Sequence, residues 1–283
     1  MKLRKILLLG LLGLCVPLTG CSDDEKDPVN DPASEEVPHH PTSNFDRCPL
    51  LAHIDNPKLG IKEITEERYE DGELAYKIVY SYDKEQRLVK ITGSDYYETY
   101  EYDAKGRLSK YTEMSASGVW GDRYTFFYDD YGFLSKWQGE DLIEETSNGY
   151  EAVCVYKYDT VFCNYKDGSE WYVYSEDMYM TTEWHDDYIY YYEWRNGNCL
   201  NIKDENGGVR KYTYDDKLNT RRLLNALPIG CTYYDKTENN IIQTQEYGDD
   251  NRVVKYEYTY DDNGLVTMMQ HGVSKVVYTY IYY

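Results

Sequence analysis

The chain has 283 residues, a formal net charge of −21 and 35 tyrosines. A mean hydropathy of −0.75 leaves few aliphatic side chains, so any core must be built largely from tyrosine rings, whose hydroxyls need a partner or water. The excess of negative charge excludes nucleic-acid binding, which depends on neutralising phosphates with lysine and arginine. The length allows one large all-β domain or two small ones.

The first twenty residues have the pattern of a secretory signal peptide. Lys2, Arg4 and Lys5 precede an apolar run over Ile6–Leu18, which is shorter than the ~20 residues of a transmembrane helix. The ending Leu18-Thr19-Gly20-Cys21 resembles a bacterial lipobox. The resemblance implies cleavage before Cys21 and acylation of that cysteine. A plain signal peptide followed by an incidental cysteine is the alternative.

The segment after Cys21 predicts an extended tether over residues 21–47. Ser22-Asp23-Asp24-Glu25 resembles the acidic tag that carries Bacteroidetes lipoproteins to the outer face of the outer membrane; it equally fits the start of an acidic linker. The resemblance implies a surface-exposed outer-membrane lipoprotein, with a periplasm-facing one as the alternative. A segment of prolines, acidic residues and polar residues has too little apolar surface to form a core. His39-His40 lies in this tether. We expect these histidines to be solvated, with a metal site as the alternative.

Residues 48–283 are predicted to form a single tyrosine-rich antiparallel β domain. From Lys58 onward there is one proline, Pro228, and central strands exclude proline. The pairs Asp71-Gly72, Asp167-Gly168 and Asn196-Gly197 are typical of two-residue hairpin turns, and Asp204–Gly208 is a looser version.

Runs rich in Tyr, Val, Thr and Ile lie between these turns and predict strands. They are Lys77–Tyr82, Tyr96–Tyr102, Tyr124–Tyr128, Glu151–Tyr158, Trp171–Tyr174, Tyr188–Trp194, Lys255–Tyr260 and Lys275–Tyr283. The nearest approach to a helical stripe, Glu140–Glu145, is short. A meander of well over ten strands usually curls, closes or splits, so we expect a strongly curved, barrel-like sheet. Asn225–Gly230 is the predicted irregular crossing between its halves.

The sequence Tyr100–Tyr111, YEYDAKGRLSKY, predicts the basic hairpin of the domain. Gly106 supplies a positive φ that closes the loop Ala104-Lys105-Gly106, with Asp103 opposite Arg107 and Tyr102 opposite Leu108. Similar words occur at Asp83, Asp129 and Asp261. Asp83, Asp103 and Asp129 are spaced like Asp215, Asp235 and Asp261, which indicates an internal duplication.

This hairpin word resembles the YD repeat of Rhs and teneurin shells, closely at Tyr100–Leu108 and loosely elsewhere. Lipobox, acidic tag, proline-containing linker and tyrosine-rich meander together resemble Bacteroidetes lipoproteins of unknown function with a porin-like β fold. That resemblance covers residues 58–283 and the N-terminal signals. It implies an antiparallel barrel-like sheet and no known activity.

Catalytic motifs are absent from the sequence, and we expect no cofactor. Ser81–Lys84 matches Ser-x-x-Lys only across a hairpin loop, and 51 acidic residues make carboxylate pairs uninformative. Asp261–Gly264 and Gly248–Asn251 have residues that favour turns and that also bind Ca²⁺ weakly. We expect His185-Asp186-Asp187 to be a loop tip, with a metal site as the alternative.

Five cysteines remain after Cys15 and Cys21 are set aside, so at least one lacks an intramolecular disulfide partner; the five are Cys48, Cys154, Cys163, Cys199 and Cys231. A turn at Tyr158-Asp159 would bring Cys154 opposite Cys163 for a disulfide. Because this turn lacks glycine, we expect a long strand with buried thiols instead.

Three of the five tryptophans, Trp171, Trp184 and Trp194, lie in the middle of the chain. With Tyr172, Tyr174 and Tyr190 they could form a platform on which a ligand stacks. The structural alternative is that they fill the wide end of a curved sheet.

We therefore predict a non-enzymatic lipoprotein, anchored to the outer membrane by Cys21, whose β domain is a scaffold that binds a glycan or another envelope protein. A surface hydrolase acting on polysaccharide is the first alternative. An outer-membrane β-barrel is the second, but charged strands such as Arg252–Glu257 do not fit a lipid-facing band.

Overall fold

The computed structural model describes residues 58–130, 132–143, 150–157, 160–165, 168–174, 180–185, 188–226, 237–247 and 251–283; for residue 150 and those between 155 and 188 it describes the backbone alone. The strands are β1 (Ile61–Glu70), β2 (Glu73–Tyr82), β3 (Leu88–Thr92), β4 (Tyr96–Tyr102), β5 (Leu108–Ser115), β6 (Gly121–Tyr128), β7 (Leu134–Asp141), β8 (Tyr150–Lys157), β9 (Thr160–Tyr165), β10 (Gly168–Tyr174), β11 (Met180–His185), β12 (Tyr188–Arg195), β13 (Asn198–Asp204), β14 (Val209–Leu218), β15 (Asn239–Tyr247), β16 (Arg252–Lys255), β17 (Glu257–Tyr260), β18 (Val266–His271) and β19 (Ser274–Tyr282).

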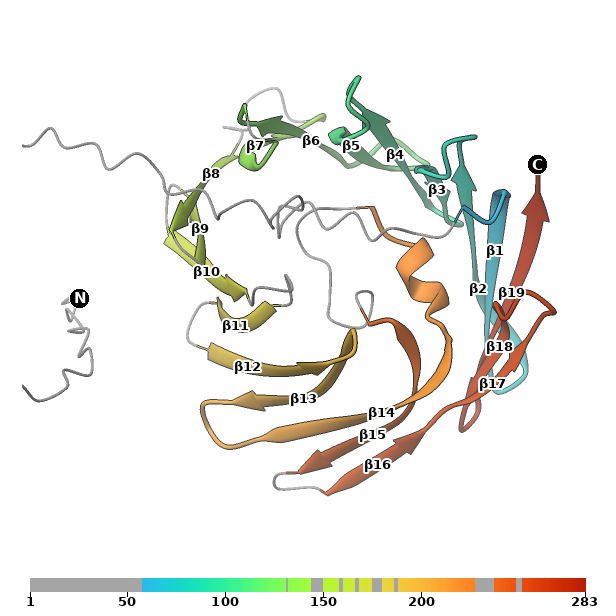
Figure 1. Cartoon of the computed structure of the whole chain (residues 1–283). Helices are drawn as coiled ribbons and strands as arrows, with labels where there is room; N and C mark the ends of the chain where they lie inside the picture. The colour runs from blue at the N-terminus through green and yellow to red at the C-terminus, as the bar shows by residue number, and fades with distance from the viewer. Residues whose placement is uncertain are drawn as a thin grey trace, which may run out of the picture. The chain divides into compact units, whose positions relative to one another are not determined.

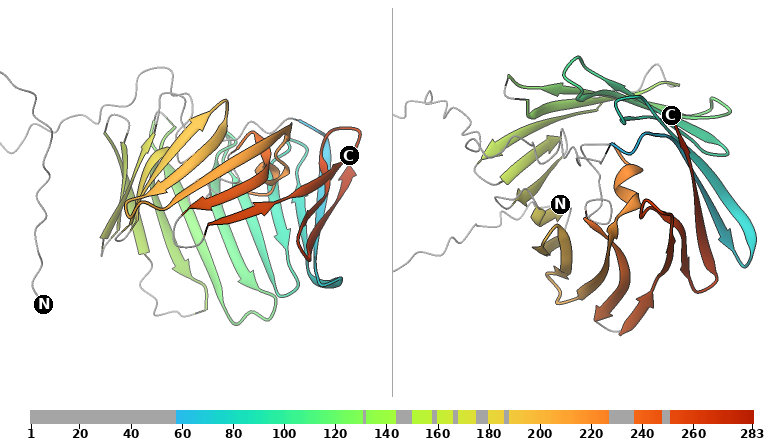
Figure 2. Two further views of the ribbon diagram at one scale, coloured as in Figure 1. Left: turned by 90° about the horizontal axis from the view of Figure 1, so that it is seen from below. Right: turned by 45° about the vertical axis from the view of Figure 1, so that its right-hand side comes forward.

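These strands form one antiparallel sheet of 19 strands, which confirms the all-β prediction (Figure 1). Each strand pairs with the next along the chain up to β16 and again from β17 onward, and Tyr256 alone separates β16 from β17. β1 pairs with both β2 and β19, so the two ends of the meander lie side by side. The turned views in Figure 2 show the alternating directions of neighbouring strands.

Two-residue turns set the register where the sequence predicts them. Asp71 and Gly72 both have positive φ, and Tyr69 lies opposite Leu74. Asn196 and Gly197 make the same kind of turn. The turn expected at Asp167-Gly168 does not include Gly168, which already belongs to β10 and pairs with Tyr165; Asp167 lies outside the described residues.

The hairpin at Asp103 has the predicted loop. Gly106 has φ 79°, and its N–H donates to the carbonyl of Asp103 over 2.9 Å. One carboxylate oxygen of Asp103 accepts the N–H groups of Lys105 and Arg107, each over 2.9 Å, and the other pairs with the Arg107 guanidinium at 2.7 Å. The loops at Asp83, Asp129 and Asp261 repeat the carboxylate contact to the residue four positions on.

Arginine and tyrosine side chains join neighbouring hairpins at this edge of the sheet. The Arg87 guanidinium lies 4.7 Å from the ring centre of Tyr102, and that of Arg107 lies 4.4 Å from the ring centre of Tyr128. The Tyr102 hydroxyl donates to the Leu88 carbonyl over 2.7 Å, and Tyr128 donates to the Leu108 carbonyl. Each hairpin is thus fixed to the one before it by a cation–π contact and a hydrogen bond.

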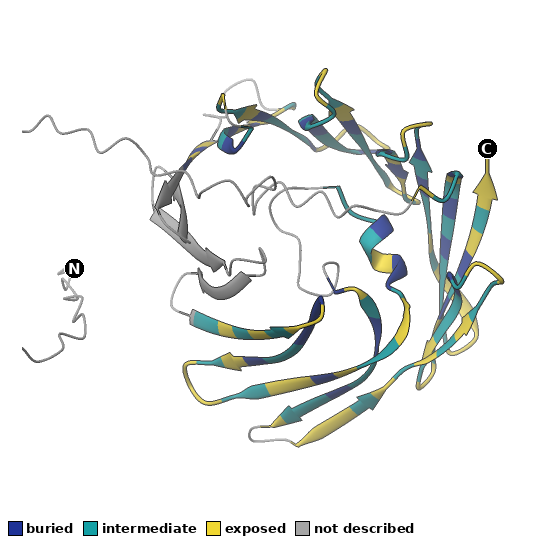
Figure 3. Cartoon of the chain, viewed as in Figure 1, coloured by how far each residue is buried: buried dark blue, intermediate teal, exposed yellow. Residues whose placement is uncertain are grey.

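In described strands such as β1, β5 and β7, buried residues are interspersed with more exposed ones (Figure 3). As expected from composition, tyrosine supplies much of the core. The buried or half-buried tyrosines of the main core cluster include Tyr80, Tyr82, Tyr100, Tyr111, Tyr258, Tyr278 and Tyr280. A smaller cluster of Cys199, Ile202, Tyr212 and Ile241 lies on β13–β15.

Helical structure in the described part of the chain is confined to short turns. The 3₁₀ helix η2 (Thr220–Leu223) follows β14 and packs Leu223 against the main cluster. Its Asn219 N-cap accepts the N–H of Arg221. No described helix is long and apolar enough to cross a membrane. Residues 140–141, in the segment that came nearest to a helical stripe, belong to β7.

Several other expectations change against the structure. The irregular segment at Asn225–Gly230, of which 227–230 lie outside the described residues, connects β14 and β15, which are paired neighbours. Asp215 lies within β14 rather than in a hairpin loop, so it does not match Asp83 in the proposed duplication; Asp235 is not described.

The long strand expected through Cys154 and Cys163 is wrong: β8 and β9 form a hairpin in which these residues are register partners. Cys199 is a buried free thiol.

Replacing Asp103 by alanine should lower the free energy of unfolding by about 1–3 kcal/mol, because two loop N–H groups and the Arg107 guanidinium lose their acceptor. Chemical denaturation monitored by circular dichroism measures the change. Asp262→Ala is the matched control, since Asp262 is an exposed residue of an equivalent loop and should change stability by less than about 0.5 kcal/mol. Equal effects of the two substitutions would contradict the assigned role of Asp103.

Candidate binding site

The predicted site residues fall in different parts of the chain. Cys21 lies outside the described residues. Trp171 and Trp184 are direct register partners on β10 and β11, but their side chains are not described. Trp194 is half-buried and packs against the smaller core cluster, which fits the structural alternative for this one residue.

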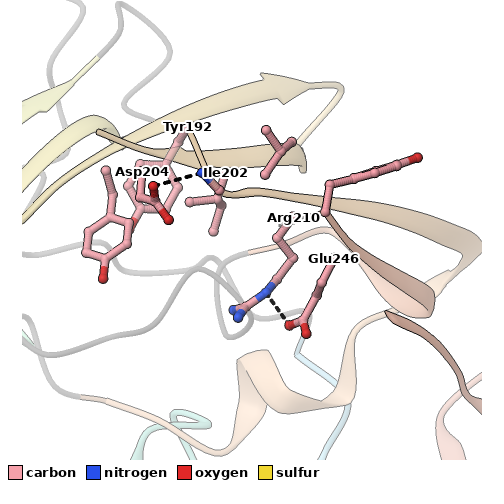
Figure 4. Close-up of a pocket in the computed structure, with 9 residues that line it drawn as sticks. Tyr192, Ile202, Asp204, Arg210 and Glu246 are labelled. Atoms are coloured by element: carbon pink, nitrogen blue, oxygen red, sulfur yellow. Dashed lines mark hydrogen bonds and ion pairs between the residues drawn. The ribbon is translucent and has the colours of Figure 1, made fainter. Parts of the chain in front are cut away.

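A groove of about 410 Å³ lies on β12–β15, beside the smaller core cluster (Figure 4). Aromatic, aliphatic and charged side chains meet there. Its lining residues are Tyr190, Tyr192, Ile202, Asp204, Gly208, Val209, Arg210, Glu246 and Tyr247. Tyr190 alone among the described members of the predicted aromatic platform belongs to this set.

The register of four strands explains why these residues share a face. Tyr192 lies opposite Ile202, Ile202 opposite Arg210, and Arg210 opposite Glu246. Directly opposed residues point to the same side of a sheet. A row of aromatic, apolar and charged side chains therefore crosses β12, β13, β14 and β15. Tyr190 and Asp204 are paired two residues further along β12 and β13, and so lie on the same face.

The Asp204 turn forms one end of the groove. An Asp204 carboxylate oxygen accepts the N–H groups of Asn206 and Gly208, each over 2.9 Å. A Cβ atom at Gly208 would lie 2.3 Å from the other oxygen, so a side chain there would displace the carboxylate. Glycine at this position keeps Asp204 seated and leaves its second oxygen beside the groove.

An ion pair occupies the other wall. Arg210 Nε lies 2.7 Å from the Glu246 carboxylate, and both side chains remain partly exposed. The pair presents a donor fork and an acceptor to solvent next to the tyrosine rings. Such groups bind hydroxyls and amides without requiring a charged ligand.

The groove combines aromatic faces with hydrogen-bonding groups. Asp204 accepts two backbone N–H groups, and Glu246 is paired with arginine. Tyrosine faces beside hydrogen-bonding groups suit a ligand that is apolar on its faces and polar at its edge.

In the described part of the chain, the segments considered as candidate metal sites do not bring together a set of metal ligands. Asp261 uses a carboxylate oxygen to accept the N–H groups of Asn263 and Leu265, so this segment acts as a turn. Across the described residues no group of three or more His, Cys, Asp or Glu side chains is placed to hold a metal ion. Residues 248–250 and Asp186-Asp187 lie outside those residues, as does His39-His40.

A half-buried acidic pair lies elsewhere in the sheet, where Glu98 on β4 is directly opposite Glu113 on β5. Burial raises the pKa of Glu98; the Tyr100 hydroxyl, which donates to it, opposes the rise, and the Glu113 charge adds to it. This pair has no local signal in the sequence, since charged residues alternate with tyrosines in many of the strand segments.

Comparisons with known proteins assign no family. No family model matches the chain, and no curated protein matches it. Among solved structures, a porin-like protein from Bacteroides uniformis is 13% identical with a TM-score of 0.46, covering 80% of this chain and 99% of its own. A porin-like protein from Bacteroides vulgatus is 12% identical with a TM-score of 0.40, covering 78% and 98%. The TcdB2–TccC3 structure is 11% identical with a TM-score of 0.24, and 15% of that chain is covered.

Glu98→Gln should stabilise the protein at neutral pH. A carboxyl whose pKa is raised by folding contributes its full stability below the unfolded value and loses it as pH rises through the raised value. Glutamine keeps an acceptor for Tyr100 and removes the repulsion from Glu113, about 0.2–1 kcal/mol, or a melting temperature roughly 1–4 °C higher. Thermal melts at pH 7 and pH 4 test this, and the difference should vanish at pH 4.

The control for that substitution is Glu101→Gln. Glu101 is exposed on the same strand and pairs with Lys110 at 3.4 Å. Its loss should leave the melting temperature unchanged or slightly lower. A rise equal to that of Glu98→Gln would show that reduced net charge, not the Glu98–Glu113 pair, is the cause.

Proposed function

We propose that this chain is a lipid-anchored protein of the outer membrane that binds glycan at the groove on β12–β15 and does not turn it over. The observation that carries the proposal is the row of Tyr192, Arg210 and Glu246 side chains on one face, with Tyr190 and Asp204 beside it. Tyrosine rings stack on the apolar faces of sugars, and the charged groups bind their hydroxyls.

The anchor in this proposal is Cys21, at the end of the signal-like segment Met1–Gly20. The proline-containing stretch up to residue 47 then spaces the domain from the membrane, at the cell surface if the acidic tag acts as an export signal. Pairing of β19 with β1 supports a sheet that curls into a barrel-like scaffold. Such a scaffold would hold the groove in a fixed shape.

Tyr190→Ala should weaken binding of a cell-envelope or dietary polysaccharide by about tenfold or more, the change expected when ~1.4 kcal/mol of contact is lost. Full-length protein in mild detergent, screened on a glycan array and then titrated by calorimetry, gives the measurement. Arg210→Gln, which changes polar contacts rather than packing, should also weaken binding.

Tyr191→Ala is the matched control for this test. Tyr191 is the next residue on β12, 47% exposed, and does not line the groove. It should bind like the unaltered protein. Release of reducing sugar that is abolished by a carboxylate substitution would contradict the binding-only proposal and favour a hydrolase.

Cys21→Ala should move the protein from the membrane fraction to the soluble fraction, because the acyl chains would be lost. Fractionation with immunoblotting measures the distribution, and incorporation of labelled palmitate into the unaltered chain tests acylation directly. Membrane association that persists unchanged in the Cys21→Ala chain would contradict the anchor.

A further inference from the structure

A second cavity, of about 210 Å³, lies beside η2 and shares no lining residue with the groove. Its walls come from η2, β15, β18, β19 and the strand that Tyr256 interrupts. They include Arg221, Asn240, Tyr256, Tyr258, Met269 and Tyr278. An apolar cavity of about 150 Å³ holds a benzene ring, so this one has room for a single six-membered ring with substituents.

Tyr278 brings an unused hydroxyl to this cavity. The residue is only 8% exposed, and its hydroxyl has no hydrogen-bond partner among the described residues. Other core tyrosines are paired: Tyr80 donates to Glu66 over 3.0 Å, Tyr258 to the Ile241 carbonyl over 2.8 Å, and Tyr280 to the Val266 carbonyl over 2.6 Å. The Tyr278 hydroxyl therefore remains available to bond a ligand in the cavity.

Asn240 offers the complementary group. It is 4% exposed, and its side-chain nitrogen donates to the Asp215 carboxylate over 3.1 Å and to the Leu218 carbonyl over 3.2 Å. These acceptors fix the orientation of the amide. The side-chain oxygen of Asn240 has no donor in the described part of the chain and remains an acceptor.

Charges of both signs flank the cavity. Arg221 lines the cavity. The Asp215 carboxylate accepts from the Asn240 side chain, and Glu66 is the register partner of Tyr278. A cation in the lining and carboxylates next to two lining residues favour neither a strongly anionic nor a cationic ligand.

We propose that this cavity binds one neutral sugar ring. Its hydroxyls can accept from Tyr278 and donate to Asn240, and its apolar edge can meet Met269 and the tyrosine rings. This rests on the proposed function in taking the ligand to be carbohydrate, and adds a separate subsite that takes a single residue.

Calorimetry and saturation-transfer NMR with free neutral monosaccharides (glucose, galactose, mannose, xylose and N-acetylglucosamine) test the proposal on the full-length protein. At least one should bind, and Tyr278→Phe should weaken it about tenfold or more without lowering the melting temperature, since it removes only the unpaired hydroxyl. Tyr280→Phe is the matched control. Tyr280 lies on the same strand as Tyr278, does not line the cavity and donates its hydroxyl to the Val266 carbonyl, so the substitution should lower the melting temperature and keep sugar binding.

Absence of binding by every sugar in the panel, or equal binding by the Tyr278→Phe protein, would overturn the proposal, as would binding of a uronic acid alone. Tyr190→Ala separates this result from the groove. It should weaken polysaccharide binding and leave monosaccharide binding unchanged. If the unaltered protein binds monosaccharide but no polysaccharide, the proposed groove site is refuted. If it binds polysaccharide but no monosaccharide, the proposed cavity site is refuted.

Discussion

The contact on which this structure depends is the tyrosine hydroxyl bonded to a carbonyl of the neighbouring strand. With few aliphatic residues, the core uses rings for apolar burial and must satisfy each hydroxyl at the same time. Tyr102, Tyr128, Tyr258 and Tyr280 do this with main-chain carbonyls. The Asp–Arg loops place two of these rings under an arginine of the preceding hairpin, so loop chemistry and core packing are coupled.

The hairpins could be predicted because their signals are local. Asp71-Gly72, Asn196-Gly197 and the loop at Gly106 require positive φ, and each sets its own register. The Cys154–Cys163 pairing is only an alternative at the level of sequence, because Tyr158-Asp159 contains no glycine to signal a turn. The pairing of β1 with β19 could not be derived, since no turn connects them and only the hydrophobic pattern would specify their register.

The groove was largely hidden from the sequence for a related reason. Counting back from the Asn196-Gly197 turn would place Tyr192 opposite Asn201. A bulge between Glu193 and Trp194 shifts the pairing so that Tyr192 faces Ile202, and Arg210 joins the same row. Tyr190 was named through its neighbourhood with tryptophans, whereas Arg210 and Glu246 had no local signal. The sequence predicts Asp204 as a turn residue. The structure confirms this role and also places Asp204 in the groove lining.

The pairing of the first strand with the last has a consequence for how the chain is made. Ser274 bonds Glu70 across 204 positions, and Tyr283 bonds Tyr82 across 201. Every other pairing joins strands adjacent along the chain, so hairpins can form one after another as residues emerge. β1 must wait with an open edge until the final strand arrives. Such a long-range step is slow because loop-closure entropy is paid before the contact forms, and until then the exposed edge is open to pairing with other chains.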